Sequence, residues 1–152
     1  MCMRGVQDAV EGSRSTIDAS TIQAYLETEF RVLGDSPAIL RVGVHCPELA
    51  VLHNEHRTDC SAFITACNPL SKRLDKATNA QRQAALTMEL KKRSLTFIEA
   101  VGQHPSNQWP SEPSFLVLGL RAEAAQKVGL QFEQNAIIWS GADALPQVIL
   151  LR

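Results

Sequence analysis

The sequence predicts an α+β domain, built on a single antiparallel or mixed sheet with helices mainly on one face. The chain has 152 residues, of which 45% are apolar, and this is enough for one domain with a core of its own. Helical and strand patterns alternate, and from residue 61 they follow the order strand, helix, strand, strand, helix, strand. That order is typical of a ferredoxin-like βαββαβ core, here with an N-terminal helix and strand before it and an added C-terminal strand. A mixed, layered α/β sheet of six strands is the alternative.

The N-terminal third predicts an arm followed by three elements. Residues 1–18 are rich in small and polar side chains, so we expect a disordered or flexible arm before a single domain over residues 19–152. Apolar residues at helical spacing predict a helix over 20–30, and β-branched and apolar residues predict a strand over 38–44. A short helical stretch is expected over 47–56, because a proline opens it.

The remaining elements are bounded by proline and by capping residues. An apolar run from Ala62 stops at Asn68-Pro69, because proline cannot continue a strand ladder. Thr78 and Gln81 have the spacing of a capping box, which predicts a helix ending near Arg93. The other expected elements are strands over 62–67, 96–101, 114–119, 135–139 and 147–151, a helix over 122–132 and a polar loop over 102–113.

Charge and composition exclude several classes of protein. Lys and Arg number 15 against 16 Asp and Glu, so no overall basic field favours nucleic acid or an anionic membrane surface. No apolar run approaches the roughly 18 residues of a transmembrane helix, and acidic residues interrupt the N-terminus where a secretory signal would be apolar. We therefore expect a cytoplasmic protein with no membrane partner. No phosphate loop, His-Glu-x-x-His or nucleophile elbow occurs, so the sequence names no reaction and no cofactor.

One segment is rich in residue types that bind zinc. His45, Cys46, His53, His56 and Cys60 lie close together in the sequence, with a further cysteine a few residues later. The segment lacks the Cys-x-x-Cys pair of a zinc knuckle, so we expect no metal site there. His53 and His56 are three residues apart on the expected short helix, and we expect both to face solvent. Metal binding by this segment is the alternative.

Topology brings three polar segments to one edge of the expected sheet. With right-handed crossovers, the loop over 68–77, the loop over 102–113 and the junction over 133–135 all lie at that edge. The side chains expected there are Thr65, Asn68, Ser71, Lys72, Arg73, Lys76, Asn79, Arg82, Trp109, Glu112, Gln134 and Asn135. We expect any ligand site to lie at this edge.

The residue types at this edge favour an anionic ligand. Between Lys72 and Arg82 four basic residues stand against one acidic residue, beside a helix N-terminus that attracts anions. Trp109 offers a flat face for a ring, and Glu112 offers a carboxylate for acid–base chemistry if the protein is an enzyme. The expected ligand contacts are Thr65, Asn68, Asn79, Arg82, Trp109, Gln134 and Asn135. Ordinary roles in turns, helix caps and a surface lid stay open for these residues.

Several short segments are similar to those of a known family. They are Tyr25 with Thr28, residues 64–69, Asn79 at a helix start, Trp109 with Glu112, Ser114-Phe115 and residues 132–137. Together they resemble the bacterial domain of unknown function 3293 family between residues 24 and 150. Cys67 departs from the family pattern, in which an aromatic residue is frequent. The resemblance implies a bacterial, cytosolic protein and no particular activity.

The sequence therefore predicts a protein that binds a small ligand bearing a phosphate or carboxylate, such as a nucleotide, at one edge of its sheet. An alternative is a protein-interaction module that forms a homodimer through the apolar strand over 147–151. RNA binding is a lesser alternative, because aromatic residues make up only 5% of the chain and no RNA-recognition strand pattern occurs.

Overall fold

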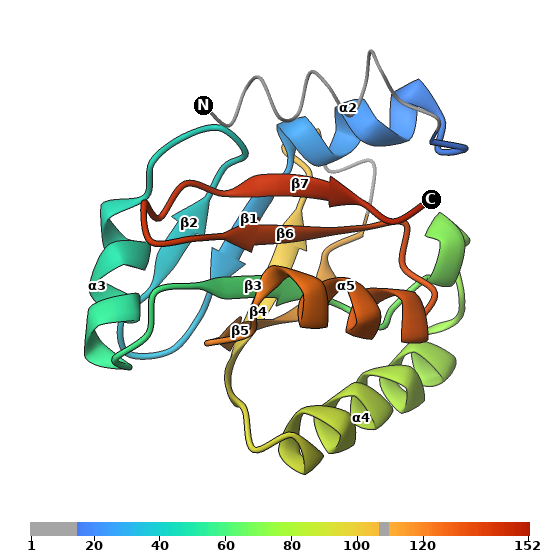
Figure 1. The fold of residues 1–152 in the computed structure, drawn as a ribbon. Helices are drawn as coiled ribbons and strands as arrows, with labels where there is room; N and C mark the ends of the chain where they lie inside the picture. The colour runs from blue at the N-terminus through green and yellow to red at the C-terminus, as the bar shows by residue number, and fades with distance from the viewer. Residues whose placement is uncertain (1–14, 107–109) are drawn as a thin grey trace.

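The structure is a computed structural model, and it describes residues 15–106 and 110–152 (Figure 1). Within these residues four α-helices accompany one sheet of seven strands. The helices are α2 (Ala19–Glu27), α3 (Pro47–Glu55), α4 (Lys76–Lys92) and α5 (Ala122–Gln131). The strands are β1 (Glu29–Val32), β2 (Ala38–Leu40), β3 (Ser61–Ile64), β4 (Thr96–Gln103), β5 (Glu112–Leu118), β6 (Ala136–Ser140) and β7 (Gln147–Leu150). The α+β class and the single sheet are confirmed.

The strands lie in the order β2-β1-β4-β5-β3-β6-β7, and every pairing is antiparallel. The alternative of a mixed sheet is therefore wrong, and the sheet is larger than the six strands of that alternative. Helix α4 connects β3 to β4, and α5 connects β5 to β6. In each case one other strand lies between the two that the helix connects.

Helices cover both faces of the sheet, so the prediction that they lie mainly on one face is wrong. Side chains alternate between faces along each strand. In β3, Ala62 and Ile64 belong to a core cluster with Leu86 of α4 and Val128 of α5, whereas Phe63 belongs to a second cluster. The second cluster contains Leu49 and Leu52 of α3, with Tyr25 and Leu26 of α2 packed against it. The sequence periodicity predicted the helices, but the face that each one covers depends on the path of the chain.

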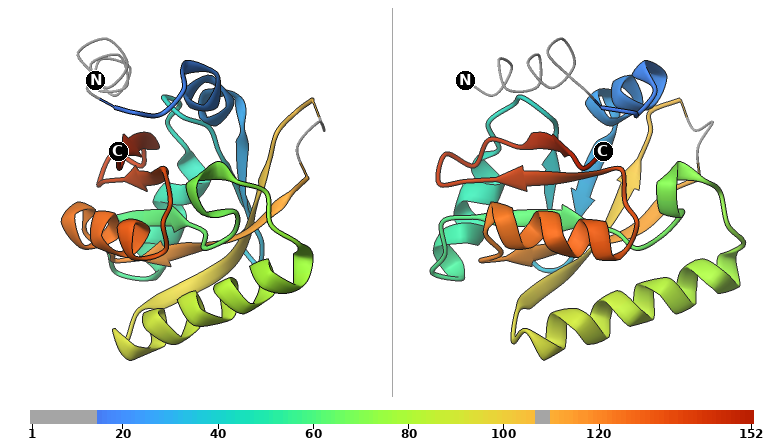
Figure 2. Two further views of the ribbon diagram at one scale, coloured as in Figure 1. Left: turned by 90° about the vertical axis from the view of Figure 1, so that its right-hand side faces the viewer. Right: turned by 45° about the vertical axis from the view of Figure 1, so that its right-hand side comes forward.

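The sheet is curled, and α2 lies on the opposite side of it from α4 and α5 (Figures 1 and 2). Phe30 of β1 and Phe63 of β3 meet edge to face inside the curl, with ring centroids 5.1 Å apart. This places β1, β3 and α2 around a common interior, which forms the apolar side of the site described below.

The first helix is shorter than predicted because a strand follows it directly. The predicted helix over 20–30 ends at Glu27, and Thr28 is already extended, with φ −71° and ψ 143°. Phe30 and Val32 are buried while Arg31 is exposed, which is the two-residue period of a strand. Pairing of β1 with both β2 and β4 outweighs the helical spacing of the isolated segment.

Other predicted boundaries also move: the strand predicted over 38–44 ends at Leu40, and the strand predicted over 96–101 extends to Gln103. The N-cap of α4 is Asp75, whose carboxylate accepts a hydrogen bond from the backbone N–H of Thr78 at 3.2 Å, so Thr78 lies inside the helix rather than at its cap. The strand predicted over 62–67 ends at Ile64. After it, the Thr65 hydroxyl donates to the Pro113 carbonyl and accepts from the backbone N–H of Cys67, replacing ladder bonds. Glu112, predicted in a loop, begins β5 and pairs with Gly102.

The histidine- and cysteine-rich segment is dispersed by the fold. His53 is 4% exposed and its Nε2 lies 2.8 Å from the Ser61 hydroxyl, so the expectation that it faces solvent is wrong, whereas His56 is exposed. In the part of the chain that the structure describes, no three metal-binding side chains gather into a site. Cys46, Cys60 and Cys67 are buried free thiols. The expectation that this segment holds no metal site stays a prediction from the sequence.

Within residues 15–106 and 110–152, no helix combines the length and the apolar character needed to span a membrane. The predicted arm falls almost entirely in residues 1–14, which lie outside the described residues. Trp109 lies outside them too.

Candidate functional site

A cavity of about 450 Å³ lies between α2 and the inner face of the curled sheet. Its apolar wall includes Phe30, Phe63, Ala136 and Ile138. Its polar lining comes from α2, from the loop after β3, from the end of β4, from the start of β5 and from the residues before β6: Ser20, Thr21, Tyr25, Glu27, Thr28, Thr65, Asn68, Ser71, Arg73, His104, Glu112, Ser114 and Gln134. A cavity of this size, with an apolar wall and a few convergent polar groups, has the character of a small-molecule site.

Glu112 is held in this cavity by a fixed pair of asparagines. The side-chain oxygen of Asn68 accepts from the backbone N–H of Leu74 at 2.9 Å and from Asn79 Nδ2 at 2.8 Å. Because a backbone N–H must meet an oxygen, the Asn68 nitrogen is turned toward Glu112 and donates to its Oε2 at 2.8 Å. Asn79 is fixed in the same way, since its Oδ1 accepts from the backbone N–H of Asn68 at 2.9 Å. The carboxyl group therefore has one defined orientation.

The environment of Glu112 favours its neutral form. Burial raises the pKa of the Glu112 carboxyl above its ordinary value, and the hydrogen bond from Asn68 opposes part of that rise. Burial also raises the pKa of Tyr25, and the negative charge of Glu112 raises it further, which puts the phenol and the carboxyl in one electrostatic environment. Among the described residues, no cation lies within ion-pair distance of Glu112.

The rim of the cavity is a tight loop between β3 and α4. Asn68, Leu70 and Ser71 all have positive φ, at 49°, 56° and 60°. The loop is held by the backbone N–H of Leu70, which donates to the Glu133 carbonyl at 2.7 Å, and by Asn135, whose Nδ2 donates to the Ser71 hydroxyl at 2.8 Å. These contacts keep a strained backbone in place beside the cavity, as is common at binding sites.

Arg82 does not line the cavity. Its Nε donates to the Ala66 carbonyl at 2.7 Å and its Nη2 to the Phe132 carbonyl at 2.6 Å. The guanidinium thereby ties the end of β3 to the end of α5, and the placement favours a structural role for a residue that the sequence suggested as a ligand contact. Burial raises the pKa of the neighbouring Cys67 thiol, so this thiol is not activated as a nucleophile.

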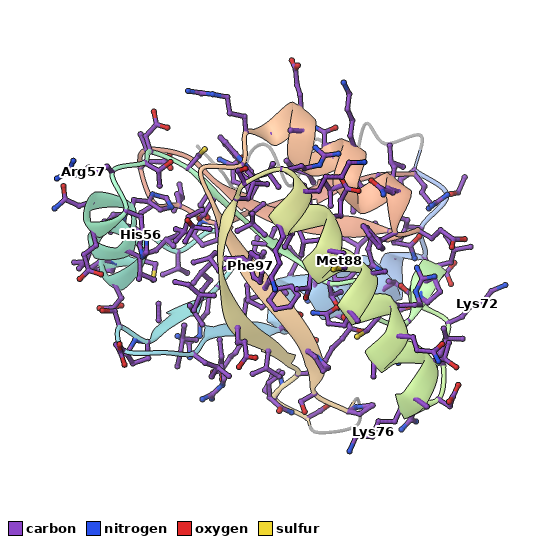
Figure 3. All side chains as sticks on the ribbon, turned by 90° about the horizontal axis from the view of Figure 1, so that it is seen from below. His56, Arg57, Lys72, Lys76, Met88 and Phe97 are labelled. Carbon is purple, nitrogen blue, oxygen red and sulfur yellow. The ribbon has the colours of Figure 1, made fainter. Side chains whose placement is uncertain are left out.

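The basic residues of the loop are spread rather than gathered. Lys72 and Lys76 are exposed and lie at the periphery of the molecule near the start of α4 (Figure 3). Arg73 is also exposed, but it lines the cavity. The locally positive sequence therefore brings one arginine to the mouth of the cavity and no lysine into its interior.

The predicted convergence of three polar segments at one sheet edge is confirmed by direct contacts. Asn68 meets Glu112, Ser71 meets Asn135, and Gln134 Nε2 donates to the Cys67 carbonyl at 3.1 Å. Thr65, Asn68, Glu112 and Gln134 line the cavity, while Asn79 supports it from behind. Asn135 lies beside its rim. The role of Trp109 falls outside the described residues and stays a prediction.

Sequence reasoning missed the contribution of α2. Tyr25 and Thr28 line the cavity, and the Tyr25 hydroxyl lies 3.3 Å from that of Ser71. His104 was missed as well, and its Nε2 lies 3.2 Å from Glu27 Oε1. No spacing rule signals these residues, because α2 is brought over the sheet only by the β1 pairings that follow it.

The comparison with protein families fits this arrangement. Residues 64–137 match the family described as "Protein of unknown function (DUF3293)". This segment of the chain belongs to the DUF3293 family. The matched DUF3293 segment runs from the end of β3 into β6, so it contains Asn68, Asn79, Glu112 and Gln134, whereas α2 precedes it. No curated protein and no solved structure matches the chain significantly.

Proposed function

We propose that this DUF3293 protein binds a small organic molecule in the cavity under α2. The observation that carries the proposal is Glu112, a half-buried carboxyl group fixed by Asn68 and Asn79, which lines a cavity with an apolar wall and has no cationic partner among the described residues. Keeping such a group in a protein interior costs stability unless a ligand or a network satisfies it. Glu112 is thus a ligand contact and, if the protein is an enzyme, its acid or base.

The expected anionic group on the ligand is proposed only for the mouth of the cavity. Among the described residues, Arg73 is the only basic residue of the lysine and arginine types that lines the cavity, and its side chain is exposed. Deeper in, the lining carries Glu112, which would repel a phosphate or carboxylate when ionised. A ligand that bears an anion would therefore keep that group near Arg73.

A thermal-shift screen tests this proposal. A library that contains cationic, neutral and anionic metabolites should contain ligands that raise the melting temperature by roughly 5–10 °C at about a hundred times their Kd. Ala24→Leu, which places extra bulk on the cavity wall, should weaken each hit at least roughly tenfold. Ala19→Leu makes the same change on an exposed part of the same helix and should leave the hits unchanged. If no compound stabilises the protein, or if both variants bind equally, the proposal is wrong.

A second proposal concerns self-association. β7 lies at one end of the sheet and pairs with β6 on one side, and no other strand within residues 15–106 and 110–152 pairs with its second edge, which can therefore accept an added strand from a partner. We propose a homodimer through this edge, and a constant monomer mass by light scattering over a wide concentration range would refute it. Helices lie on both faces of the sheet, so we make no proposal of RNA binding by an open sheet face.

We also propose that β3-α4-β4-β5-α5-β6 forms a ferredoxin-like core. The strand order β4-β5-β3-β6 and its antiparallel pairing support this.

A further inference from the structure

Three hydroxyl groups that line the cavity, those of Thr28, Thr65 and Ser114, offer only hydrogen-bond acceptors because their protons are already in use. The Thr28 hydroxyl donates to the Ala24 carbonyl at 2.6 Å, and the Thr65 hydroxyl donates to the Pro113 carbonyl at 2.6 Å. The Ser114 hydroxyl donates to the backbone carbonyl of Glu112 at 3.0 Å. A hydroxyl has one proton and two lone pairs, so each of these lining groups has only acceptor capacity left.

The donor protons of the Gln134 side chain are also already in use, and this side chain is buried. Its side chain is 7% exposed and lines the cavity. Both protons of Nε2 are used, one toward the Cys67 carbonyl at 3.1 Å and one toward the Phe132 carbonyl at 3.2 Å. Among the described residues no hydrogen bond reaches its Oε1, which is therefore left to accept from a ligand.

Glu112 adds a third kind of acceptor. Its Oε2 accepts from Asn68, and among the described residues no donor reaches its Oε1. The apolar wall beside these groups includes two aromatic rings, Phe30 and Phe63, whose faces attract cations. The part of the lining that these acceptors and aromatic rings form is complementary to a group that carries several N–H donors and positive charge, whereas the exposed Arg73 lies at the mouth of the cavity.

We propose that the cavity binds a small amine or amidine, with its cationic nitrogen on Glu112 and its carbon body against the Phe30–Phe63 wall. This inference rests on the proposed function, since it assigns the ligand class of the same cavity. An ammonium or amidinium group supplies the donors that Glu112 and Gln134 lack, and a neutral or anionic analogue leaves them unsatisfied.

The charged surroundings of Glu112 determine how binding depends on pH. The titratable and charged groups that line the cavity or share its electrostatic environment are Tyr25 and Glu27 of α2, Cys67 and Arg73 of the loop after β3, and His104 at the end of β4. Glu27 and His104 are partners of each other. A cation placed on Glu112 favours the ionised carboxyl, so binding of the amine releases a proton and strengthens as the pH rises.

Three probes with one ring system and different charge test the inference. Tryptamine is a cation, tryptophol is neutral and indole-3-acetate is an anion, and their affinities are measured by ligand-observed NMR and calorimetry on the full chain. We expect tryptamine to bind at least roughly tenfold more tightly than tryptophol, and indole-3-acetate to bind most weakly. Binding of none of the three, or equal binding of all three, overturns the inference. The broader screen above decides separately whether the cavity binds any small molecule.

Variants and proton release provide the remaining tests. Glu112→Gln should weaken tryptamine at least roughly tenfold and leave tryptophol within about twofold. Glu123→Gln makes the same change on the exposed surface of α5 and should alter neither affinity. If Glu112→Gln does not fold, calorimetry of the unmodified protein in two buffers still measures proton release, which should accompany tryptamine binding and not tryptophol binding. Unchanged tryptamine affinity in Glu112→Gln, or proton release that is the same for tryptamine and tryptophol at every pH measured, contradicts the inference.

Discussion

Replacing Asn79 by alanine should both destabilise the fold and disorder the carboxyl group of the site. The substitution removes the acceptor of the Asn68 backbone N–H at 2.9 Å and the donor to Asn68 Oδ1 at 2.8 Å. The two bonds contribute about 1 kcal/mol each, and the Asn68 N–H is left without its partner in a partly buried position. We therefore expect a loss of about 2–3 kcal/mol in the free energy of unfolding, which is roughly 4–12 °C in melting temperature for a domain of this size.

Urea denaturation of the unmodified chain and of Asn79→Ala measures this loss. Gln81→Ala is the control, because Gln81 is an exposed residue of the same helix, and its replacement should change stability by less than about 0.5 kcal/mol. Without Asn79, Asn68 can turn away from Glu112, which removes a hydrogen bond that lowers the pKa of that carboxyl. A loss below about 0.5 kcal/mol in Asn79→Ala would refute the reasoning that the asparagine pair holds the site.

Three further predictions concern the core and its ties. Burial lowers the pKa of His53 from 6.5, so the unfolded chain binds a proton before the folded one does, and stability should fall as the pH drops below about 6.5. In His53→Gln that part of the pH dependence, measured by urea denaturation, should vanish. Gly129→Ala should lower the free energy of unfolding by about 1–2 kcal/mol, because a Cβ there would lie 2.9 Å from Cγ2 of the buried, β-branched Ile137. This steric cost should exceed the gain in helix propensity, so a variant that thermal denaturation shows to be stabilised would contradict the prediction. Arg82→Met should lower the free energy of unfolding by about 2–3 kcal/mol, because it removes two hydrogen bonds to backbone carbonyls. Arg93→Met breaks an i,i+4 ion pair and should lower it by under about 0.5 kcal/mol. Equal losses in the two variants would show that the hydrogen bonds of Arg82 to the carbonyls do not add to stability.

Local sequence determines most of the helices, because their signals are local. Pro47 opens α3, and the capping-box spacing of Thr78 and Gln81 predicts α4, although the N-cap of that helix is Asp75. The predicted helix over 20–30 includes the first two residues of β1, because Phe30 continues the helical spacing of Ile22 and Leu26. Only its ladders to β2 and β4 decide its conformation, and such pairing is a long-range contact that a short window cannot show.

The sequence by itself determined the class of the fold and the meeting of Asn68, Glu112 and Gln134 at one edge, because strand order and crossover handedness fix where loops emerge. Tertiary structure alone decided that α2 covers the inner face, that Arg82 is bound to carbonyls, and that the hydroxyl protons of Thr28 and Thr65 are used. The physical reason is that spacing along a chain reports which face a residue belongs to. Which partner takes each proton or fills each face depends on contacts between segments far apart in the sequence.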